Sequence, residues 1–463
     1  MKKMLKIRKI IAVMVLPLLL YVTGCSPTDQ DGTKAEFNWK SEEGKTISVF
    51  LTQHPYTDAI IKKLPDFEEK TGITVDYILS PEDNYFNKLS LSFESQNPPD
   101  VYMTGVYQLW EYVPNNYVQE LDEFINDLNL TDSSYDIDDF YPNILDSLKW
   151  NSSLGHRMGK GSILAVPMGF EQYVLAYNKR IFAERGLKPP KTINDLLQLS
   201  KDLHEFDGKG TYALALRGIR SWTSVHPGYM STYVAYGAKD FELADDKLIS
   251  VVNSPEAVEA TDKWVEIIKK GASPSWQSYT WYQASADFGA GRAAMLYDAD
   301  AVGYFQNVKG YSKEAGNIAW VTAPLPYEGA ENKSNLWIWN LAMNKQSKEK
   351  NASWLFMQYF TNKEHQLWSA LEVNGVNTPR QSVFNNPKYT DMIAQSDNYI
   401  ETFNQTIEHA SIQFMPQPYF TETTDLWAGT IQDLVASKYK STQEGMDVLK
   451  EEMDKALNEV KVK

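Results

Sequence analysis

Hydrophobic residues along the chain alternate between short β-rich runs and longer stretches with helical spacing. Between residues 46 and 104 the pattern predicts strands over 46–51, 73–79 and 101–104, separated by helices over 56–70 and 85–95. Parallel strands need a crossover between them, and a helix is the usual one. This order therefore predicts a parallel sheet with helices on both faces.

A second series of the same kind begins near residue 163. Thr192 and Asp195 have the spacing of a capping box, which predicts a helix over 193–206. Further strand candidates cover residues 163–166, 174–177, 212–216, 293–297, 318–322 and 336–343. The last quarter is mainly helical and ends in an amphipathic stretch over 442–460. Together the two series predict an α/β protein.

The first 25 residues have the pattern of a targeting segment. Basic residues without any acid precede an apolar run over 10–21, which is shorter than the roughly 20 residues that a membrane span needs. The run ends in Val22-Thr23-Gly24-Cys25, which resembles the lipobox of bacterial lipoproteins and contains the only cysteine. That resemblance implies a signal peptide over 1–24 and a lipid on Cys25. The polar residues 25–44 would be a flexible tether. An ordinary secretory peptide with a free thiol is the alternative.

The charge balance is acidic. The formal net charge is −15, and the first 24 residues carry five positive charges, so without them it becomes −20. A chain with this negative charge is unsuited to binding nucleic acid, and the charge disfavours broad contact with an anionic membrane. The lipid on Cys25 would then be what holds the protein at the membrane. A single cysteine excludes an internal disulfide and a cysteine-rich metal site.

Motifs for catalysis or cofactors are missing from the sequence. There is no H-E-x-x-H, G-x-S-x-G or Walker A pattern, and the six histidines lack ligand spacing. Residues 289–294 fit G-x-G-x-x-[G/A], but a helix is predicted before them and a strand after, the reverse of a dinucleotide site. We therefore expect no metal, no cofactor and no enzymatic activity. The alternative is a cell-surface carbohydrate-degrading enzyme that uses carboxylates in a cleft.

A series of short motifs recurs in a fixed order through most of residues 45–463. The motifs are Phe67–Val75 (FEEKTGITV), Pro99–Val101 (PDV), Ala165–Pro167, Tyr177–Lys179 with Phe182 and Gly186-Leu187, Pro190–Thr192, Phe288–Met295 (FGAGRAAM) and Ala323–Pro326 (APLP). In this order they resemble extracellular solute-binding proteins of family 1. These are the substrate-capturing lipoproteins of ABC importers, with maltose-binding protein as a distant relative.

The resemblance implies a two-lobed periplasmic-binding-protein-like fold, in which two doubly wound sheets are joined by a hinge and a ligand cleft lies between the lobes. One lobe would comprise residues 45–167 plus 326–378, and the other 168–325 plus 379–463. It also implies a monomer, anchored by lipid at the outer face of the bacterial cytoplasmic membrane. The protein would capture a carbohydrate, with an oligosaccharide favoured, and deliver it to ABC permease subunits.

Candidate ligand-binding residues follow the predicted strands, because ligands of open α/β sheets bind beyond the carboxyl ends of the strands. These candidates are Gln53, His54, Tyr107, Gln108, Arg217, Trp222, Asp298 and Asp300. Rings that stack on sugar faces and polar groups that bind hydroxyls suit a carbohydrate. The resemblance to maltose-binding protein adds Glu171 in the first hinge strand and Trp427 as a stacking ring. Ala301 replaces another stacking tryptophan, so a maltose pocket is not implied.

Two aromatic groups have open roles. Trp337 and Trp339 alternate along a predicted strand and could face the core or the cleft equally well. Trp281 and Tyr282 belong to a cluster that could either bind ligand or pack a helix.

Overall fold

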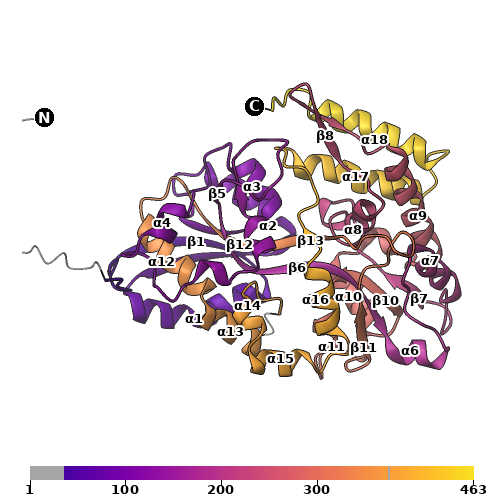
Figure 1. Ribbon diagram of the computed structural model, residues 1–463, viewed down its shortest axis with the longest axis horizontal. Helices are drawn as coiled ribbons and strands as arrows, with labels where there is room; N and C mark the ends of the chain where they lie inside the picture. Colours follow the sequence, from indigo (N-terminus) through magenta and orange to yellow (C-terminus); the bar gives the residue numbers. More distant parts are fainter. Residues whose placement is uncertain (1–35, 374–375, 463) are drawn as a thin grey trace, which may run out of the picture. The chain divides into compact units, whose positions relative to one another are not determined.

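A mixed β-sheet runs through the folded part of the chain (Figure 1). In the computed structural model, which describes residues 36–373 and 376–462, its strand order is β2-β1-β3-β12-β6-β10-β7, with β11 beside β6 and β13 beside β12. The strands are β1 (Thr46–Thr52), β2 (Thr74–Ser80), β3 (Val101–Gly105), β6 (Val166–Asn178), β7 (Tyr212–Ala215), β10 (Ala293–Ala299), β11 (Ile318–Val321), β12 (Ser334–Met343) and β13 (Ala410–Ser411). The predicted signal peptide and Cys25 lie outside the described residues.

The N-terminal strands have the predicted arrangement. β1 pairs with β2 and β3, both in parallel. Helix α1 (Pro55–Thr71) connects β1 to β2 and ends at Gly72, whose φ of 71° is the left-handed conformation that favours glycine after a helix. Helix α2 (Glu82–Phe93) connects β2 to β3, and its first residues follow the carboxyl end of β2 directly.

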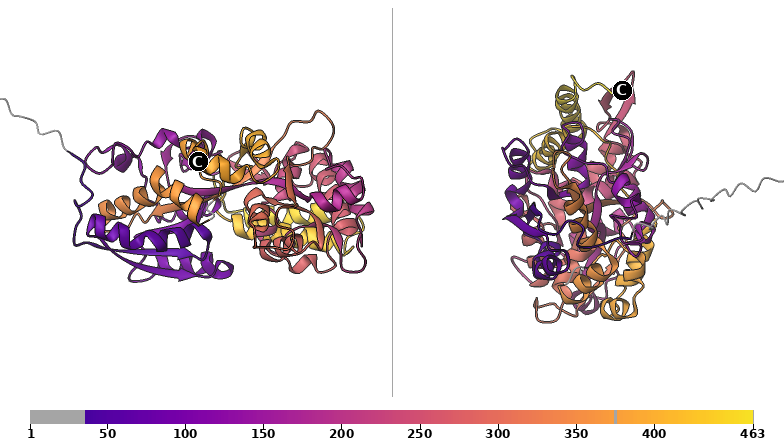
Figure 2. Two further views of the ribbon diagram at one scale, coloured as in Figure 1. Left: turned by 90° about the horizontal axis from the view of Figure 1, so that it is seen from below. Right: turned by 90° about the vertical axis from the view of Figure 1, so that its left-hand side faces the viewer.

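Strand β6 is the element that links the two ends of the sheet (Figures 1 and 2). Residues 166–172 pair with β12, and residues 173–177 pair with β10. The sequence predicted two separate strands here, over 163–166 and 174–177, and this prediction is wrong because β6 is one continuous strand. Pairing with the fully buried β12 satisfies the intervening backbone, so the strand continues through residues without a β-rich pattern.

The sheet is mixed, not purely parallel. β12 is antiparallel to β3 and β6, and β10 is antiparallel to β6 but parallel to β7. The parallel arrangement predicted for the first three strands is therefore confirmed for those strands, and β7 and β10 are also parallel. It does not hold at the centre, where β6 and β12 run in opposite directions.

Helices cover the sheet at both ends. Helices α1, α2, α3 (Val106–Tyr112) and α12 (Lys350–Thr361) contact β1–β3. Further helices are α4 (Asp122–Asn126), α5 (Pro142–Asp146), α13 (Lys363–Glu372), α14 (Gln381–Phe384) and α15 (Pro387–Ile393). Near β7 and β10 lie α6 (Lys179–Glu184), α7 (Ile193–Asp202), α8 (Gly228–Ala235), α9 (Pro255–Gly271), α10 (Trp281–Gly289), α11 (Asp300–Asn307), α16 (Tyr399–Ile407), α17 (Phe420–Val435) and α18 (Thr442–Ala456). Short elements complete the fold: β4 (Lys149–Trp150), β5 (Ser162–Ile163), β8 (Phe241–Ala244), β9 (Lys247–Ser250) and the 3₁₀ turns Ile137–Asp139, Trp222–Ser224 and Trp276–Ser278.

Two local predictions are confirmed. The Asp195 backbone N–H donates to Thr192 Oγ1 at 3.1 Å, and Asp195 accepts from the Thr192 backbone, so the capping box opens α7. Helix α10 ends at Gly289 and β10 begins at Ala293, which is the helix-then-strand order expected around the glycine motif.

The folded part begins earlier than the predicted boundary at residue 45. The ring of Trp39 lies 5.7 Å from that of Tyr359 on α12, and Lys70 Nζ lies 4.6 Å from the Trp39 ring. Phe37 packs edge-on against Trp39. None of the helices among the described residues is both long and apolar enough to cross a bilayer.

Candidate functional site

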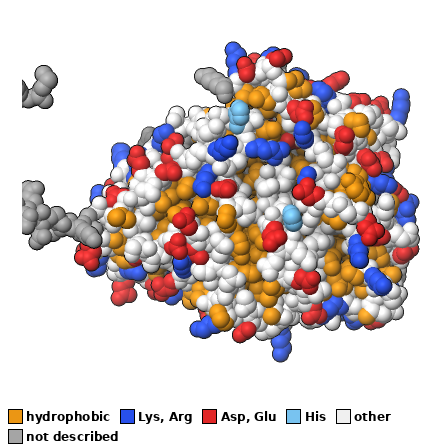
Figure 3. Space-filling view, in the orientation of Figure 1, with side chains coloured by type: hydrophobic (Ala, Val, Ile, Leu, Met, Phe, Trp, Pro, Cys, Tyr) orange, Lys and Arg blue, Asp and Glu red, His pale blue; other side chains and the backbone are white. Residues whose placement is uncertain are grey.

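A cleft of about 1700 Å³ lies between the two ends of the sheet. One wall comes from α2 and α3, and the other from the loop after β7, the start of α10 and α17. On the face seen in Figure 3, acidic and basic side chains are interspersed and form no continuous basic surface.

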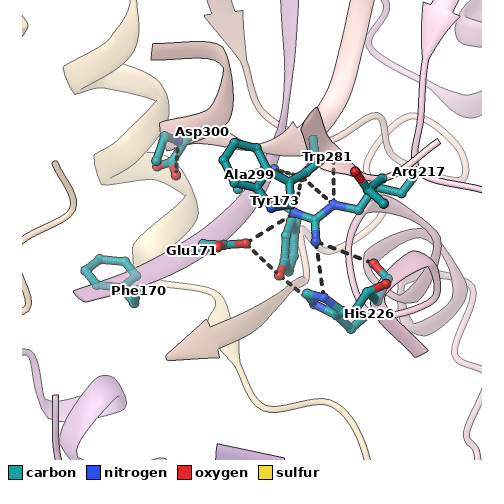
Figure 4. A network of polar contacts seen from close by, with 12 residues as sticks. Phe170, Glu171, Tyr173, Arg217, His226, Trp281, Ala299 and Asp300 are labelled. Atoms are coloured by element: carbon teal, nitrogen blue, oxygen red, sulfur yellow. Dashed lines mark hydrogen bonds and ion pairs between the residues drawn. The ribbon is translucent and has the colours of Figure 1, made fainter. Parts of the chain in front are cut away.

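A buried ion pair stands at the wall formed by the loop after β7. Arg217 donates from Nε to Asp298 Oδ2 at 2.9 Å and from Nη2 to Asp298 Oδ1 at 2.5 Å. Arg217 Nη2 also lies 3.4 Å from Glu171 Oε2 on β6 (Figure 4). Burial lowers the pKa of Arg217, but the two carboxylates raise it more, so the guanidinium stays charged. Paired in this way, the charge can remain out of water.

A chain of hydrogen bonds connects the same residues by a second route. Arg217 Nη1 lies 3.4 Å from His226 Nε2, and His226 Nδ1 lies 2.6 Å from Tyr173 Oη. Tyr173 Oη lies 3.3 Å from Glu171 Oε2. A guanidinium only donates and a carboxylate only accepts, so the bonds run from Arg217 through neutral His226 and Tyr173 to Glu171. Burial, together with the charge of Arg217, lowers the pKa of His226 and keeps the ring neutral.

Glu171 is the member of this network whose carboxyl titrates near neutral pH. Burial raises the pKa of its carboxyl to about 7, and this outweighs the lowering by Arg217. Its side chain keeps 15% of its exposure, so it can still accept a hydrogen bond from a bound hydroxyl.

Aromatic rings from both walls meet beside the ion pair. Phe86 on α2 and Trp222 after β7 both line the cleft, with ring centroids 5.9 Å apart. Trp337 and Trp339 on β12 are buried and pack behind these rings. The ring centroids of Trp337 and Trp222 are 5.0 Å apart, and those of Trp339 and Phe86 are 6.2 Å apart. The Trp337 ring needs Gly105 at the end of β3, because a Cβ there would lie 1.9 Å from its Cη2 atom.

Gln108 on α3 lines the cleft and has an unpaired side-chain amide. The residue is only 4% exposed, yet within the described residues neither Nε2 nor Oε1 has a hydrogen-bond partner. Leaving a buried donor and acceptor unpaired costs about 1–3 kcal/mol each. An amide with both a donor and an acceptor suits a hydroxyl group, which also has both.

The predicted site residues are divided by the structure. Gln108, Arg217 and Trp222 line the cleft, and Glu171 and Asp298 contact Arg217. His54 caps α1, with its ring 5.0 Å from Trp339, and Gln53 is exposed before it.

Three other predicted residues are held by protein partners away from the cleft wall: Tyr107, Asp300 and Trp427. Tyr107 is buried and donates to the Leu336 carbonyl at 2.6 Å. Asp300 accepts from Gln172 Nε2 at 3.0 Å and from Asn377 Nδ2 at 2.5 Å, and it points away from the Arg217 network in Figure 4.

Trp427 lies in the core, not at the cleft. It is 1% exposed, its indole N–H donates to Tyr229 Oη at 3.0 Å, and its ring packs edge-on against Tyr233. The face of α17 that carries Trp427 turns toward α8, while other residues of the same helix, such as Asp425, line the cleft. One face of α17 turns toward the core and another toward the cleft, and the resemblance alone did not determine on which of them Trp427 lies.

Sequence reasoning missed Glu82 and Phe86, and left Trp281 and Tyr282 unassigned. All four line the cleft. Glu82 comes directly after β2, so the rule applied to the other strand ends would have selected it.

Comparison with known proteins places this architecture in a family. The model of the bacterial extracellular solute-binding proteins matches residues 53–367, which is more than half of the chain. The chain belongs to the bacterial extracellular solute-binding proteins.

Relatives within this family carry more specific names. An erythritol/L-threitol-binding protein of Mycolicibacterium smegmatis is 37% identical over 412 residues, which is 88% of this chain and 86% of that protein. A mannitol-binding protein of Pseudomonas aeruginosa is 27% identical over 58% of this chain and 57% of its own length. Family membership implies an extracellular or periplasmic location.

Solved structures support the fold of this solute-binding protein. A solute-binding protein of Agrobacterium radiobacter in complex with ribitol has a TM-score of 0.75 at 22% identity, covering 89% of this chain and 99% of that one. Likeness at this level confirms the predicted two-lobed α/β fold, with the cleft between the lobes.

Replacing Trp427 distinguishes a core role from a ligand role. Because the ring is buried among tyrosines, Trp427→Ala should lower the free energy of unfolding of the free protein by about 3–5 kcal/mol. Urea unfolding without ligand measures this. If the variant were fully stable but had lost ligand binding, Trp427 would be a ligand-binding residue and not a core residue.

Glu171→Gln should change how stability depends on pH. The carboxyl titrates near 4.5 when unfolded and near 7 when folded, so folding takes up a proton between these values. The contribution of Glu171 to stability therefore falls as the pH rises through this window. The free energy of unfolding of the variant, relative to the unsubstituted protein, should rise by up to ~3 kcal/mol from pH 4.5 to 7.5.

Urea titrations at several pH values measure that difference. The exposed Glu123→Gln serves as control, and its difference from the unsubstituted protein should be independent of pH. A flat difference for Glu171→Gln would contradict the raised pKa.

Proposed function

We propose that this protein captures a sugar alcohol or a small sugar in the cleft and delivers it unchanged to the permease of an ABC importer. The single observation that carries the proposal is the buried, unpaired amide of Gln108, a residue that lines the cleft together with Arg217, Trp222 and Phe86. The proposal assigns no chemical step to the cleft.

The groups at this end of the cleft complement a chain of hydroxyls. Gln108 can both donate and accept, and Glu171, whose side chain keeps 15% of its exposure, can accept. The apolar rings would cover the C–H surface of the ligand, while the polar groups set its orientation. Relatives named for erythritol, L-threitol and mannitol support this class of ligand.

The size of the cleft supports an oligosaccharide as a second candidate. Small-molecule sites usually have volumes of roughly 300–1000 Å³, and this cleft is larger at about 1700 Å³. Tyr282 and Tyr419 line it with 45% and 44% of their surface exposed, so they could stack on further sugar rings.

We infer that ligand stabilises the closed arrangement of two lobes that are joined by β6. The proposed lobes are residues 45–167 with 326–378 and residues 168–325 with 379–463. Each wall of the cleft supplies only part of the site, so a ligand that contacts both favours the closed arrangement. The full chain is proposed to be a monomer, anchored by lipid on Cys25 at the outer face of the cytoplasmic membrane.

A binding panel with a Gln108 variant tests the proposal. Among erythritol, ribitol, mannitol and maltotriose, at least one polyol should raise the melting temperature, because a ligand at 100 times its Kd adds about 2.7 kcal/mol. Gln108→Leu should weaken binding of that polyol roughly tenfold without lowering the stability of the free protein, since the variant loses no protein hydrogen bond.

Calorimetric titration measures the affinities, with the exposed Gln405→Leu on α16 as control. Binding of maltotriose alone would favour the oligosaccharide candidate. Release of reducing ends from an oligosaccharide would favour the enzyme alternative. Unchanged polyol binding by Gln108→Leu would show that the ligand does not contact Gln108 and that the site has been placed wrongly.

Anchoring is tested separately. Cys25→Ser removes the only thiol that could carry a lipid, so the variant should leave the membrane fraction of washed cells and appear in the soluble fraction. Immunoblots of both fractions measure this. A variant that stays with the membranes would contradict lipid anchoring through Cys25.

A further inference from the structure

Glu82 stands where the two walls of the cleft touch. It is the first residue of α2, and its Oε2 atom accepts from Trp281 Nε1 at 3.2 Å and from Tyr282 Oη at 3.5 Å. Trp281 and Tyr282 are the first residues of α10. α2 follows β2 at one end of the sheet and α10 precedes β10 at the other, so this contact spans the cleft.

The two donors are held together by contacts within their own wall. Their rings stack with centroids 3.7 Å apart. The capping box of Thr280 and Gln283 fixes the helix start that carries them. Glu82 therefore meets a preformed pair of donors, and little side-chain freedom remains to be lost when the walls meet.

The carboxyl of Glu82 is largely removed from water where the walls touch. Burial raises the pKa of its carboxyl, whereas the hydrogen bond from Trp281 and the charge of Arg217 lower it. Asp83 is the neighbouring acid that opposes them. A carboxylate removed from water needs such donors, and separation of the walls would return it to water.

A second contact crosses the cleft from the same face of α2. Phe86 lies four residues after Glu82, and residues at this spacing share a helix face. Its ring meets Trp222 of the opposite wall edge-on. The face of α2 thus touches the other wall at a polar point and at an apolar point.

We propose that Glu82, Trp281 and Tyr282 form a latch that holds the cleft closed and slows the escape of a bound polyol. The latch acts between the walls and does not require Glu82 to contact the ligand. Its kinetic consequence rests on the proposed function, but the closed arrangement itself can be measured without any ligand.

The ligand-free experiment measures the distance between the walls. Spin labels are placed at Lys88→Cys on α2 and Lys309→Cys after α11, both exposed, in a Cys25→Ser chain that has no other cysteine. Glu82→Ala and Trp281→Phe should both move the distance distribution toward longer values. Glu94→Ala removes an exposed carboxylate at the other end of α2 and should leave the distribution unchanged. Distributions identical to the unsubstituted one in both latch variants would overturn the latch.

The kinetic experiment uses erythritol, ribitol and mannitol in turn and follows dissociation by stopped flow. Glu82→Ala should raise the dissociation rate roughly tenfold, as expected for loss of hydrogen bonds to a charged group. Trp281→Phe keeps a flat ring but loses the N–H donor, and should act in the same direction. The double variant should be no faster than the faster single variant, because both changes break one interaction.

The outcomes separate the latch from the proposed function. If Trp281→Phe is silent while Glu82→Ala weakens binding, or if the two effects add fully, Glu82 contacts the ligand directly and the latch is wrong. If none of the three polyols binds but both latch variants open the ligand-free protein, the proposed ligand class fails and the latch stands.

Discussion

The buried charge of Arg217 is the constraint on which the site depends. A guanidinium out of water must be paired, and Asp298 pairs with it from the neighbouring strand β10. Glu171 approaches from the middle of β6, so this one side chain connects the loop after β7 with the strands β10 and β6. The cleft wall is therefore positioned by electrostatics as well as by the backbone pairing of the sheet.

The same network determines which groups remain for a ligand. Glu171 accepts a hydrogen bond from Tyr173, and Arg217 contacts His226, so both residues already have partners on the protein side. Gln108 across the cleft has no such partner among the described residues, although it is as deeply buried as the ion pair. A satisfied wall thus faces an unsatisfied one, and a hydroxylated ligand between them would complete the hydrogen bonding.

Aromatic packing gives this polar site a rigid support. Trp337 and Trp339 alternate along β12 and fix the rings of Trp222 and Phe86 from behind. Their role as core or cleft was open from the sequence. The structure makes them the layer behind the cleft, because β12 is covered on both faces.

The sequence by itself determined the α/β class, the parallel start of the sheet, the capping box of α7 and the strand ends that carry Gln108, Arg217 and Asp298. These follow from local periodicity and from the rule that strand ends collect ligands. Tertiary structure alone decided that β6 is one strand, that Trp427 and Asp300 face protein partners, and that Glu82 meets Trp281 across the cleft. The reason is physical: periodicity places a residue on a face, but which element covers that face depends on contacts between residues far apart in the chain.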